Sequence, residues 1–308
     1  MIPTLNELNY LIIAGVPKAG TTSLFRYLSD HPDICGSNLK ETCFFLDPGY
    51  PRKIRLRYED GLEKYESYFN HCENQKIRLE ATPVYLYSPG TPEKIKQSLP
   101  NVKIIFILRD PIDRLVSYYR FERQANVIPS HISFEDFVTT QLENGKPVGS
   151  LPIYMRALEE GNYAKYLVSF FNTFDKDGIF ISHYDDLKDN PFVLLKSISC
   201  FVGIDAGFYE NYKFDVYHSS MTMRFPFFHG LYLKLRSKMR KRLHDRKKIR
   251  TLFRNFQHWL EPTYFKLNRR EREQISIPES LHDDLKAYYS GDQGALADLL
   301  NTQGFTYN

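Results

Sequence analysis

A lysine inside a short glycine-bounded turn is the strongest chemical feature of this sequence. The turn runs from Gly15 to Gly20 and contains Lys18; it follows the apolar run at residues 11–14 and precedes Thr21. An apolar run this short predicts a buried strand, and hydroxyl residues before an amphipathic stretch predict the start of a helix. Backbone N–H groups at a helix N-terminus bind anions, and the lysine adds a full positive charge. The sequence therefore predicts a phosphate or sulfate site at this turn.

A second cation follows the next strong strand signal. Residues 102–108 form an apolar run, Arg109 comes directly after it, and Asp110 with Pro111 predicts the start of a helix that contains Ser117. Strands that alternate with helices predict an α/β fold, with a central parallel sheet flanked by helices, and ligands of such sheets bind beyond the carboxyl ends of the strands. Arg109 and the lysine turn are therefore expected at one edge of the sheet.

The phosphate loop of nucleoside triphosphatases and kinases is the first interpretation of the turn. In that loop the lysine follows the second glycine directly, whereas Thr21 follows Gly20 here and the lysine is Lys18. The second strong strand also ends in Arg109 and Asp110, rather than in the lone aspartate that holds magnesium. The pattern keeps a phosphate-binding turn but lacks the lysine and metal arrangement of triphosphate chemistry.

Four segments resemble those of sulfotransferases that use 3′-phosphoadenylyl sulfate (PAPS), and they are most similar to the heparan-sulfate-type and bacterial branch. Residues 16–24 resemble the loop that binds the 5′-phosphosulfate, and residues 109–120 resemble the segment that holds the 3′-phosphate. Residues 40–45 resemble the K-E-x-x-F-F segment that carries the catalytic base, and residues 80–85 resemble an E-x-[ST]-P-x-Y segment. The resemblance implies a P-loop-like, nucleotide-kinase-like sulfotransferase domain over residues 1–308, with PAPS as cofactor, 3′,5′-ADP as product and no metal.

The roles of the cofactor-binding residues follow from this resemblance. Arg109 and Ser117 are implied to hold the 3′-phosphate, and Arg224 to add a late positive charge over the same group. Lys18 and the N–H groups of the turn are implied to stabilise the charge that grows on the leaving phosphate during transfer. The residues implied to surround the 5′-phosphosulfate are Lys18, Ala19, Gly20, Thr21, Thr22 and Ser23.

Glu41 is the catalytic base that the resemblance implies, because the acceptor must lose a proton as it attacks. Phe44 and Phe45 are expected to make its surroundings apolar and to raise its pKa toward the working pH. Phe44 and Glu80 are expected to contact the acceptor, with a structural ion pair as the alternative for Glu80.

The expected reaction is in-line transfer of a sulfonate from PAPS to a hydroxyl, with an amine as the alternative nucleophile. The acceptor that the resemblance implies is a carbohydrate, a glycolipid or a small metabolite. A P-loop nucleotide kinase or triphosphatase and a non-catalytic nucleotide-binding protein remain open as alternatives.

Composition sets only broad limits on function. A net charge of +4 over 308 residues favours anionic ligands weakly, and no apolar run reaches the length of a membrane span. The four cysteines show no paired metal-ligand spacing and are too few for a disulfide framework, and the first residues lack the pattern of a signal peptide. We therefore expect a reduced, cytoplasmic protein without a nucleic-acid partner.

The rest of the chain adds further expected strands at residues 77–81 and 178–182 and an irregular, basic region at residues 205–277. Within that region, residues 234–254 are interpreted as a solvated helix face, with contact to an anionic acceptor or a membrane surface as the alternatives. Two C-terminal helices are expected, at residues 278–289 and 292–300.

Overall fold

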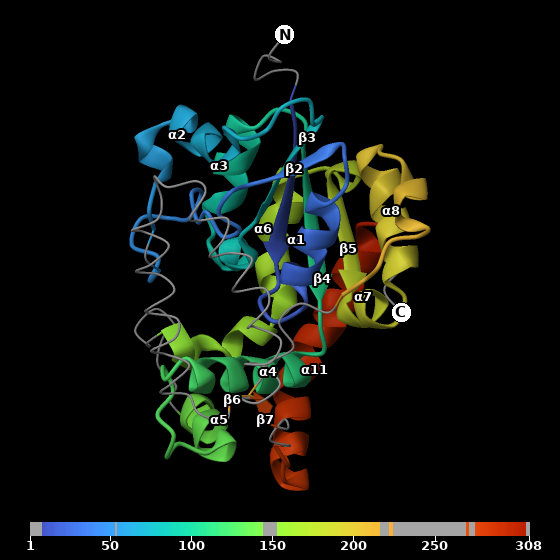
Figure 1. The fold of residues 1–308 in the computed structure, drawn as a ribbon. Helices are drawn as coiled ribbons and strands as arrows, with labels where there is room; N and C mark the ends of the chain where they lie inside the picture. The colour runs from blue at the N-terminus through green and yellow to red at the C-terminus, as the bar shows by residue number, and fades with distance from the viewer. Residues whose placement is uncertain are drawn as a thin grey trace.

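A five-stranded sheet forms the centre of the computed structural model, which describes residues 8–52, 54–143, 153–215, 222–223, 269–270 and 275–305 (Figure 1). All neighbouring strands of this sheet are parallel, and their order is β2–β3–β1–β4–β5. The expected α/β fold with a parallel sheet flanked by helices is confirmed. The strands are β1 (Asn9–Gly15), β2 (Ile34–Gly36), β3 (Ile77–Ala81), β4 (Val102–Leu108) and β5 (Ile179–His183).

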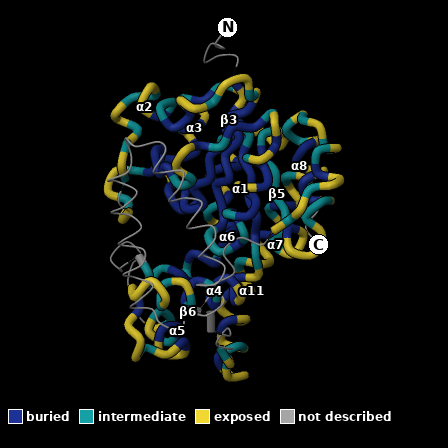
Figure 2. Tube along the Cα trace, in the orientation of Figure 1, coloured by how far each residue is buried: buried dark blue, intermediate teal, exposed yellow. Residues whose placement is uncertain are grey.

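Strand β1 lies in the middle of the sheet, between β3 and β4. Its residues from Tyr10 to Gly15 are buried, and so is the whole of β3 (Figure 2). Strands covered on both faces have nearly continuous apolar sequences, which is why β1 and β4 produce the strongest strand signals. The sequence did not indicate β2, a three-residue strand at the edge of the sheet.

Helices cover the sheet and extend beyond its carboxyl edge, where α4 and α5 lie (Figure 1). One apolar core surrounds the sheet, and a second core lies among α4, α5, α11 and the single-turn helices η6 (Ile153–Arg156) and η7 (Glu159–Gly161). The α-helices are α1 (Thr21–Ser29), α2 (Leu62–Glu66), α3 (Thr91–Ser98), α4 (Pro111–Gln124), α5 (Phe134–Glu143), α6 (Tyr163–Thr173), α7 (Tyr184–Asp189), α8 (Pro191–Val202) and α11 (Glu279–Thr302).

The C-terminal helix α11 differs from expectation. The two helices expected at residues 278–289 and 292–300 form one continuous helix. Side chains before and after Gly291 in the helix are buried by packing of α11 against α6 and α4. This burial outweighs the cost of a glycine inside a helix, which is about 1 kcal/mol. The buried residues of α11 are Leu281, Leu285, Tyr289, Leu296 and Leu300.

Cys35 of β2 and Cys72 form a disulfide, with their Cα atoms 5.9 Å apart. The expectation of reduced cysteines is therefore wrong for this pair. The pairing spans 37 residues and depends on tertiary packing, in which the N–H of Asn38 donates to the carbonyl of Tyr68 at 3.0 Å beside the bridge. Sequence spacing alone carries no signal for such a contact.

Most of the irregular region at residues 205–277 lies outside the described residues. Its described parts include a short antiparallel pair, β6 (Thr222–Met223) and β7 (Arg269–Arg270). Arg224 and residues 234–254 are not among the described residues, so the roles predicted for them stay predictions. Within the ranges that are described, no helix combines the length and the apolar character needed to cross a membrane.

Gly20, at the N-terminus of α1, occupies a position where a side chain does not fit. Its φ is 76°, and a Cβ added there would lie 2.7 Å from Cδ2 of Leu187 and 3.2 Å from a ring carbon of Tyr184. We expect Gly20→Ala to lower the free energy of unfolding by about 1–3 kcal/mol, because it combines left-handed strain with overpacking. Urea denaturation measures this change.

Gly291→Ala is the matched control for this prediction. Gly291 lies within α11, and a Cβ added there would have no atom within 4 Å. Because alanine has the higher helix propensity, we expect this change to raise the free energy of unfolding by about 0.5–1 kcal/mol. Similar effects of the two substitutions would contradict the special role of Gly20.

Candidate active site

The turn between β1 and α1 has the backbone geometry of an anion site. Gly20 caps α1 in the left-handed conformation, and Lys18 also has a positive φ, of 74°. The N–H of Val16 donates to the carbonyl of Ile107 in β4 at 3.0 Å, which ties the turn to the edge of the sheet. Because α1 begins at Thr21, the N–H groups of its first turn have no acceptor within the helix. The predicted strand, turn and helix are confirmed.

The side chain of Lys18 lies against α4. Its Nζ is 3.7 Å from the centroid of the Phe121 ring, which is a cation–π contact. Burial is the main cause that lowers the pKa of Lys18 to about 8; the charge of Arg109 acts in the same direction, and Glu122 and Glu41 oppose it. An anion bound beside Lys18 would stabilise its charged form, so the group favours an anionic ligand.

Arg109 reaches the turn from the end of β4. Its Nη1 donates to the carbonyl of Lys18 at 2.9 Å, and its guanidinium carbon lies 4.5 Å from the centroid of the Tyr184 ring. The expectation that Lys18 and Arg109 share one edge of the sheet is confirmed. Within the described part of the chain, the buried Nε of Arg109 has no hydrogen-bond partner. An unpartnered buried donor of this kind fits a phosphate oxygen.

Ser117 lies on α4, on the side that faces the turn. Residues four apart share one face of a helix, so Ser117 lies on the same face as Phe121, whose ring contacts Lys18. The side chain of Ser117 is half-buried. Helix α4 therefore presents Ser117 on the same side as Phe121, and its bond to a phosphate stays a prediction.

Glu41 is positioned by the loop that follows β2. The N–H of Ser37 donates to the carbonyl of Leu79 at 2.8 Å, and the N–H of Ala81 donates to the carbonyl of Lys40 at 3.2 Å. The loop thus continues along β3 to its carboxyl end. Glu41 comes next in the chain, at the edge of the sheet where the lysine turn also lies.

Two cations hold the carboxylate of Glu41. Its Oε1 is 3.3 Å from Nζ of Lys40, and its Oε2 accepts a hydrogen bond from Nη1 of Arg52 at 2.5 Å. Burial acts to raise the pKa of Glu41, but the charges of Lys40 and Arg52 outweigh it and the pKa is lowered. The expectation that Phe44 and Phe45 raise this pKa is wrong. Both rings are buried, with 1% and 0% of their surface exposed, and the acceptor contact expected for Phe44 stays a prediction.

Glu80 is a buried carboxylate held by hydroxyl groups. Its Oε1 accepts hydrogen bonds from Thr42 at 2.6 Å, Thr82 at 2.6 Å and Tyr85 at 2.9 Å, and its Oε2 accepts one from Tyr65 at 3.0 Å. Burial raises the pKa of Glu80, and these hydrogen bonds oppose the rise. Within the described residues its partners are hydroxyls rather than the cation of an ion pair, and its exposed fraction is 0%. Glu80 is therefore enclosed by hydroxyl groups, and its expected contact with an acceptor stays a prediction.

The comparison with protein families agrees with this arrangement. A family model described as "Sulfotransferase domain" matches residues 8–258, which include the lysine turn, Glu41 and α4. The chain belongs to the sulfotransferase family. The resemblance seen in the sequence motifs is therefore confirmed at the level of the family.

Individual sulfotransferases resemble this chain over part of its length. Human bifunctional heparan sulfate N-deacetylase/N-sulfotransferase 2 is 26% identical over 208 residues, which are 65% of this chain and 22% of the relative. The membrane-associated sulfotransferase kil1 of Dictyostelium discoideum is 38% identical over 119 residues, which are 38% of this chain and 23% of the relative. The chain thus spans less than a quarter of the length of these two relatives.

A solved structure shares the fold of this sulfotransferase over nearly its whole length. The crystal structure of a sulfotransferase from Alicyclobacillus acidocaldarius matches with a TM-score of 0.64 and 21% sequence identity, and the match covers 96% of each chain. At this level of identity the likeness shows the fold alone.

Three residues of this sulfotransferase site were not predicted from its sequence: Phe121, Tyr184 and Arg52. The position of Phe121 could have been predicted, because it follows Ser117 by four residues in one predicted helix and so lies on the same helix face. Tyr184 and Arg52 come from α7 and from the loop after the Phe44–Phe45 pair. No spacing in the sequence relates either of them to the turn.

Binding of 3′,5′-ADP to this sulfotransferase is expected to take up a proton at pH 8. Burial lowers the pKa of Lys18 to about 8, so half of the groups are neutral there, and a bound phosphate raises that pKa. The expected uptake is about 0.5 proton per site, and affinity falls as the pH rises above 8. Calorimetric titration in buffers of different ionisation enthalpy measures the uptake.

Lys18→Met is expected to bind 3′,5′-ADP more weakly and without this proton uptake. The variant separates Lys18 from other titrating groups because it keeps the length of the side chain and removes its charge. Uptake of the same size in Lys18→Met would show that another group is responsible.

Proposed function

We propose that this chain is a PAPS-dependent sulfotransferase that transfers a sulfonate to a hydroxyl of a carbohydrate, a glycolipid or a small metabolite, with an amine as the alternative nucleophile. The contact between Arg109 and Lys18 at the N-terminus of α1 supports this most strongly, together with the charge of Glu41, which acts on Lys18. Two cations and a helix N-terminus suit a ligand with two anionic groups, and the carboxylate suits an acceptor that must lose a proton.

PAPS has two anionic ends, and the residues around the turn offer donors for both. The first N–H groups of α1 and the hydroxyls of Thr21, Thr22 and Ser23 suit the 5′-phosphosulfate. The unpartnered Nε–H of Arg109 and the hydroxyl of Ser117 suit the 3′-phosphate. Because ATP lacks a 3′-phosphate, Arg109 and Ser117 would distinguish the two nucleotides.

The proposed reaction is an in-line displacement at sulfur. The acceptor oxygen forms a bond to sulfur while the bond between sulfur and the bridging oxygen of the 5′-phosphate breaks. The electron pair of the broken bond stays on that bridging oxygen, and Glu41 takes the acceptor proton. Lys18 and the N–H groups of the turn stabilise the charge on the bridging oxygen, and they do so more strongly in the transition state than in bound PAPS.

A magnesium-dependent nucleotide kinase is the alternative that must be separated from this proposal. The carboxylate that follows β4, Asp110, accepts a hydrogen bond from the N–H of Asp113 at 2.8 Å and caps α4. A carboxylate that serves as a helix cap is engaged in stabilising the helix. This role of Asp110 favours the sulfotransferase over the kinase.

Thermal denaturation with 3′,5′-ADP, ADP and magnesium–ATP tests the proposed cofactor. At about 100 times its Kd, 3′,5′-ADP is expected to add about 2.7 kcal/mol to the free energy of unfolding. The other two nucleotides are expected to stabilise the protein much less at the same concentration. Preferential stabilisation by magnesium–ATP would support the kinase and overturn the proposal.

Transfer of radiolabelled sulfonate from PAPS to a panel of sugars, glycolipids and small hydroxylated compounds tests the activity. Glu41→Gln is expected to lower transfer by about 10²–10⁴-fold, because it removes the base. The same variant is expected to keep the wild-type thermal shift with 3′,5′-ADP. A thermal shift without transfer to any acceptor in the wild-type protein would instead identify a non-catalytic nucleotide-binding protein.

A further inference from the structure

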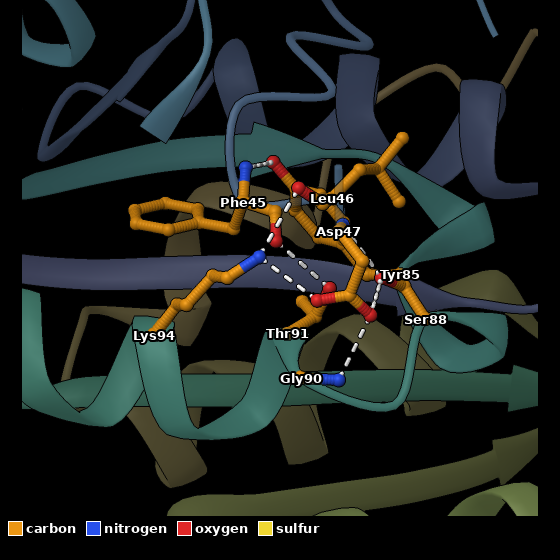
Figure 3. Close-up of polar contacts among 8 residues, drawn as sticks. All are labelled: Phe45, Leu46, Asp47, Tyr85, Ser88, Gly90, Thr91 and Lys94. Carbon is orange, nitrogen blue, oxygen red and sulfur yellow. Dashed lines mark hydrogen bonds and ion pairs between the residues drawn. The ribbon is translucent and has the colours of Figure 1, made fainter. Parts of the chain in front are cut away.

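The loop that follows Phe45 is anchored at Asp47 (Figure 3). The carboxylate of Asp47 accepts hydrogen bonds from the hydroxyl of Ser88 at 2.8 Å, the N–H of Gly90 at 2.9 Å and the ammonium of Lys94 at 2.9 Å. The N–H of Asp47 donates in turn to the Ser88 hydroxyl at 2.9 Å. These bonds fix the start of the loop against the N-terminal turn of α3.

Arg52 extends from this anchored loop to Glu41. The N–H of Tyr50 donates to the carbonyl of Asp47 at 3.1 Å, and the N–H of Arg52 donates to the carbonyl of Tyr50 at 2.7 Å, so the backbone turns tightly. Nη1 of Arg52 then donates to Oε2 of Glu41 at 2.5 Å, while Lys40 lies 3.3 Å from Oε1. Both oxygens of the proposed base are therefore engaged.

The position of Arg52 conflicts with proton transfer to Glu41. A general base must lie within about 2.6–3.2 Å of the acceptor hydroxyl that gives up its proton. The guanidinium of Arg52 already occupies a hydrogen-bonding position at Oε2, and as a cation it makes the carboxylate a weaker base. Oε2 has a second lone pair, but Arg52 restricts the approach of an acceptor to this oxygen and weakens it as a base, so opening the Arg52–Glu41 ion pair would favour proton transfer.

We propose that Arg52 is a positioning residue, which holds Glu41 while no acceptor is bound and releases it when an acceptor hydroxyl takes its place. This inference depends on the proposed role of Glu41 as the base. The side chain of Arg52 is 36% exposed, so it can move into solvent without opening the core. An engaged base also activates water poorly, which would protect bound PAPS from hydrolysis.

Other charges around the Arg52–Glu41 ion pair also act on the pKa of Glu41. Besides Arg52, the cations that act on Glu41 are Lys40 and Lys18. Because they remain when Arg52 is removed, they continue to oppose the rise in the pKa of Glu41. Several groups from neighbouring elements also share a charge interaction with Arg52: Lys40, Glu41, Cys43, Tyr50, Tyr118, Glu122 and Glu160.

Hydrolysis of PAPS, with water as the acceptor, tests the proposal without a known acceptor. In this reaction the water oxygen bonds to sulfur, the bond to the bridging oxygen breaks, and Glu41 takes the water proton. We expect Arg52→Gln to raise the rate at neutral pH by about three- to tenfold, because the base is free. We also expect the acid limb of the pH–rate profile to move to higher pH, because the loss of a cation raises the pKa of Glu41.

Two further variants serve as controls. Arg52→Lys keeps the positive charge. The acid limb of its pH–rate profile should therefore move less from the wild-type position than the limb of Arg52→Gln does. Arg55→Gln removes an exposed arginine from the same loop. It should change neither the rate of PAPS hydrolysis nor the acid limb of the pH–rate profile. All three variants should keep the thermal shift with 3′,5′-ADP, which shows that the fold and the cofactor site are intact.

The experiments distinguish a failure of the proposed role of Arg52 from a failure of the proposed function. A normal thermal shift in Arg52→Gln, combined with an unmoved acid limb or a slower hydrolysis, would overturn the role of Arg52. If the double variant Arg52→Gln/Glu41→Gln hydrolyses PAPS as fast as Arg52→Gln, the proposed base is wrong instead. If 3′,5′-ADP produces no thermal shift in the wild-type protein, the proposed cofactor is wrong.

Discussion

The hydrogen bond from the Arg109 guanidinium to the Lys18 carbonyl joins the two strand ends that form the site. It brings two cations close together in a partly buried place, where burial and the charge of Arg109 disfavour the charged form of Lys18. The Tyr184 and Phe121 rings offset part of this cost, since each lies against one of the cations, and such contacts contribute about 0.5–2 kcal/mol. An anion that binds here relieves the remaining repulsion, so the strain of the free site favours phosphate binding.

On the acceptor side, the rigid part of the site is built around a buried carboxylate. Glu80 accepts four hydroxyl hydrogen bonds, and one of its donors is Thr42, the residue after Glu41. Removing the Glu80 carboxylate would leave these buried hydroxyls without an acceptor, at a cost in stability of about 1–3 kcal/mol for each hydroxyl. Thr42 is thus held inside while Glu41, with 38% of its side chain exposed, is the adjacent residue that faces outward. Arg52 donates a hydrogen bond to Glu41 from a different loop, which the hydrogen bonds of Asp47 hold in place.

Helix α4 connects the cofactor half of the site to the second core. It carries Ser117 and Phe121, and its buried Arg114 lies 3.9 Å from the carboxylate of Glu160. Burial raises the pKa of Glu160 to about 7, so this ion pair is weak support for stability, but it fixes the helix relative to η7. The position of α4 therefore depends on packing beyond the edge of the sheet, whereas that of the lysine turn depends on β1 itself.

The sequence by itself determined the sheet strands at residues 77–81 and 102–108, the lysine turn and the family. Those features have local signals: alternation predicts the strand at residues 77–81, an apolar run predicts the strand at residues 102–108, and the glycine spacing predicts the turn. The sequence did not determine the environment of Glu41, where the adjacent phenylalanines indicated an apolar site and a raised pKa. Only the tertiary structure decided that Arg52 reaches Glu41 and lowers its pKa, and that Glu80 is enclosed by hydroxyls. Electrostatic surroundings depend on which distant segments pack together, and neighbours in the chain do not carry that information.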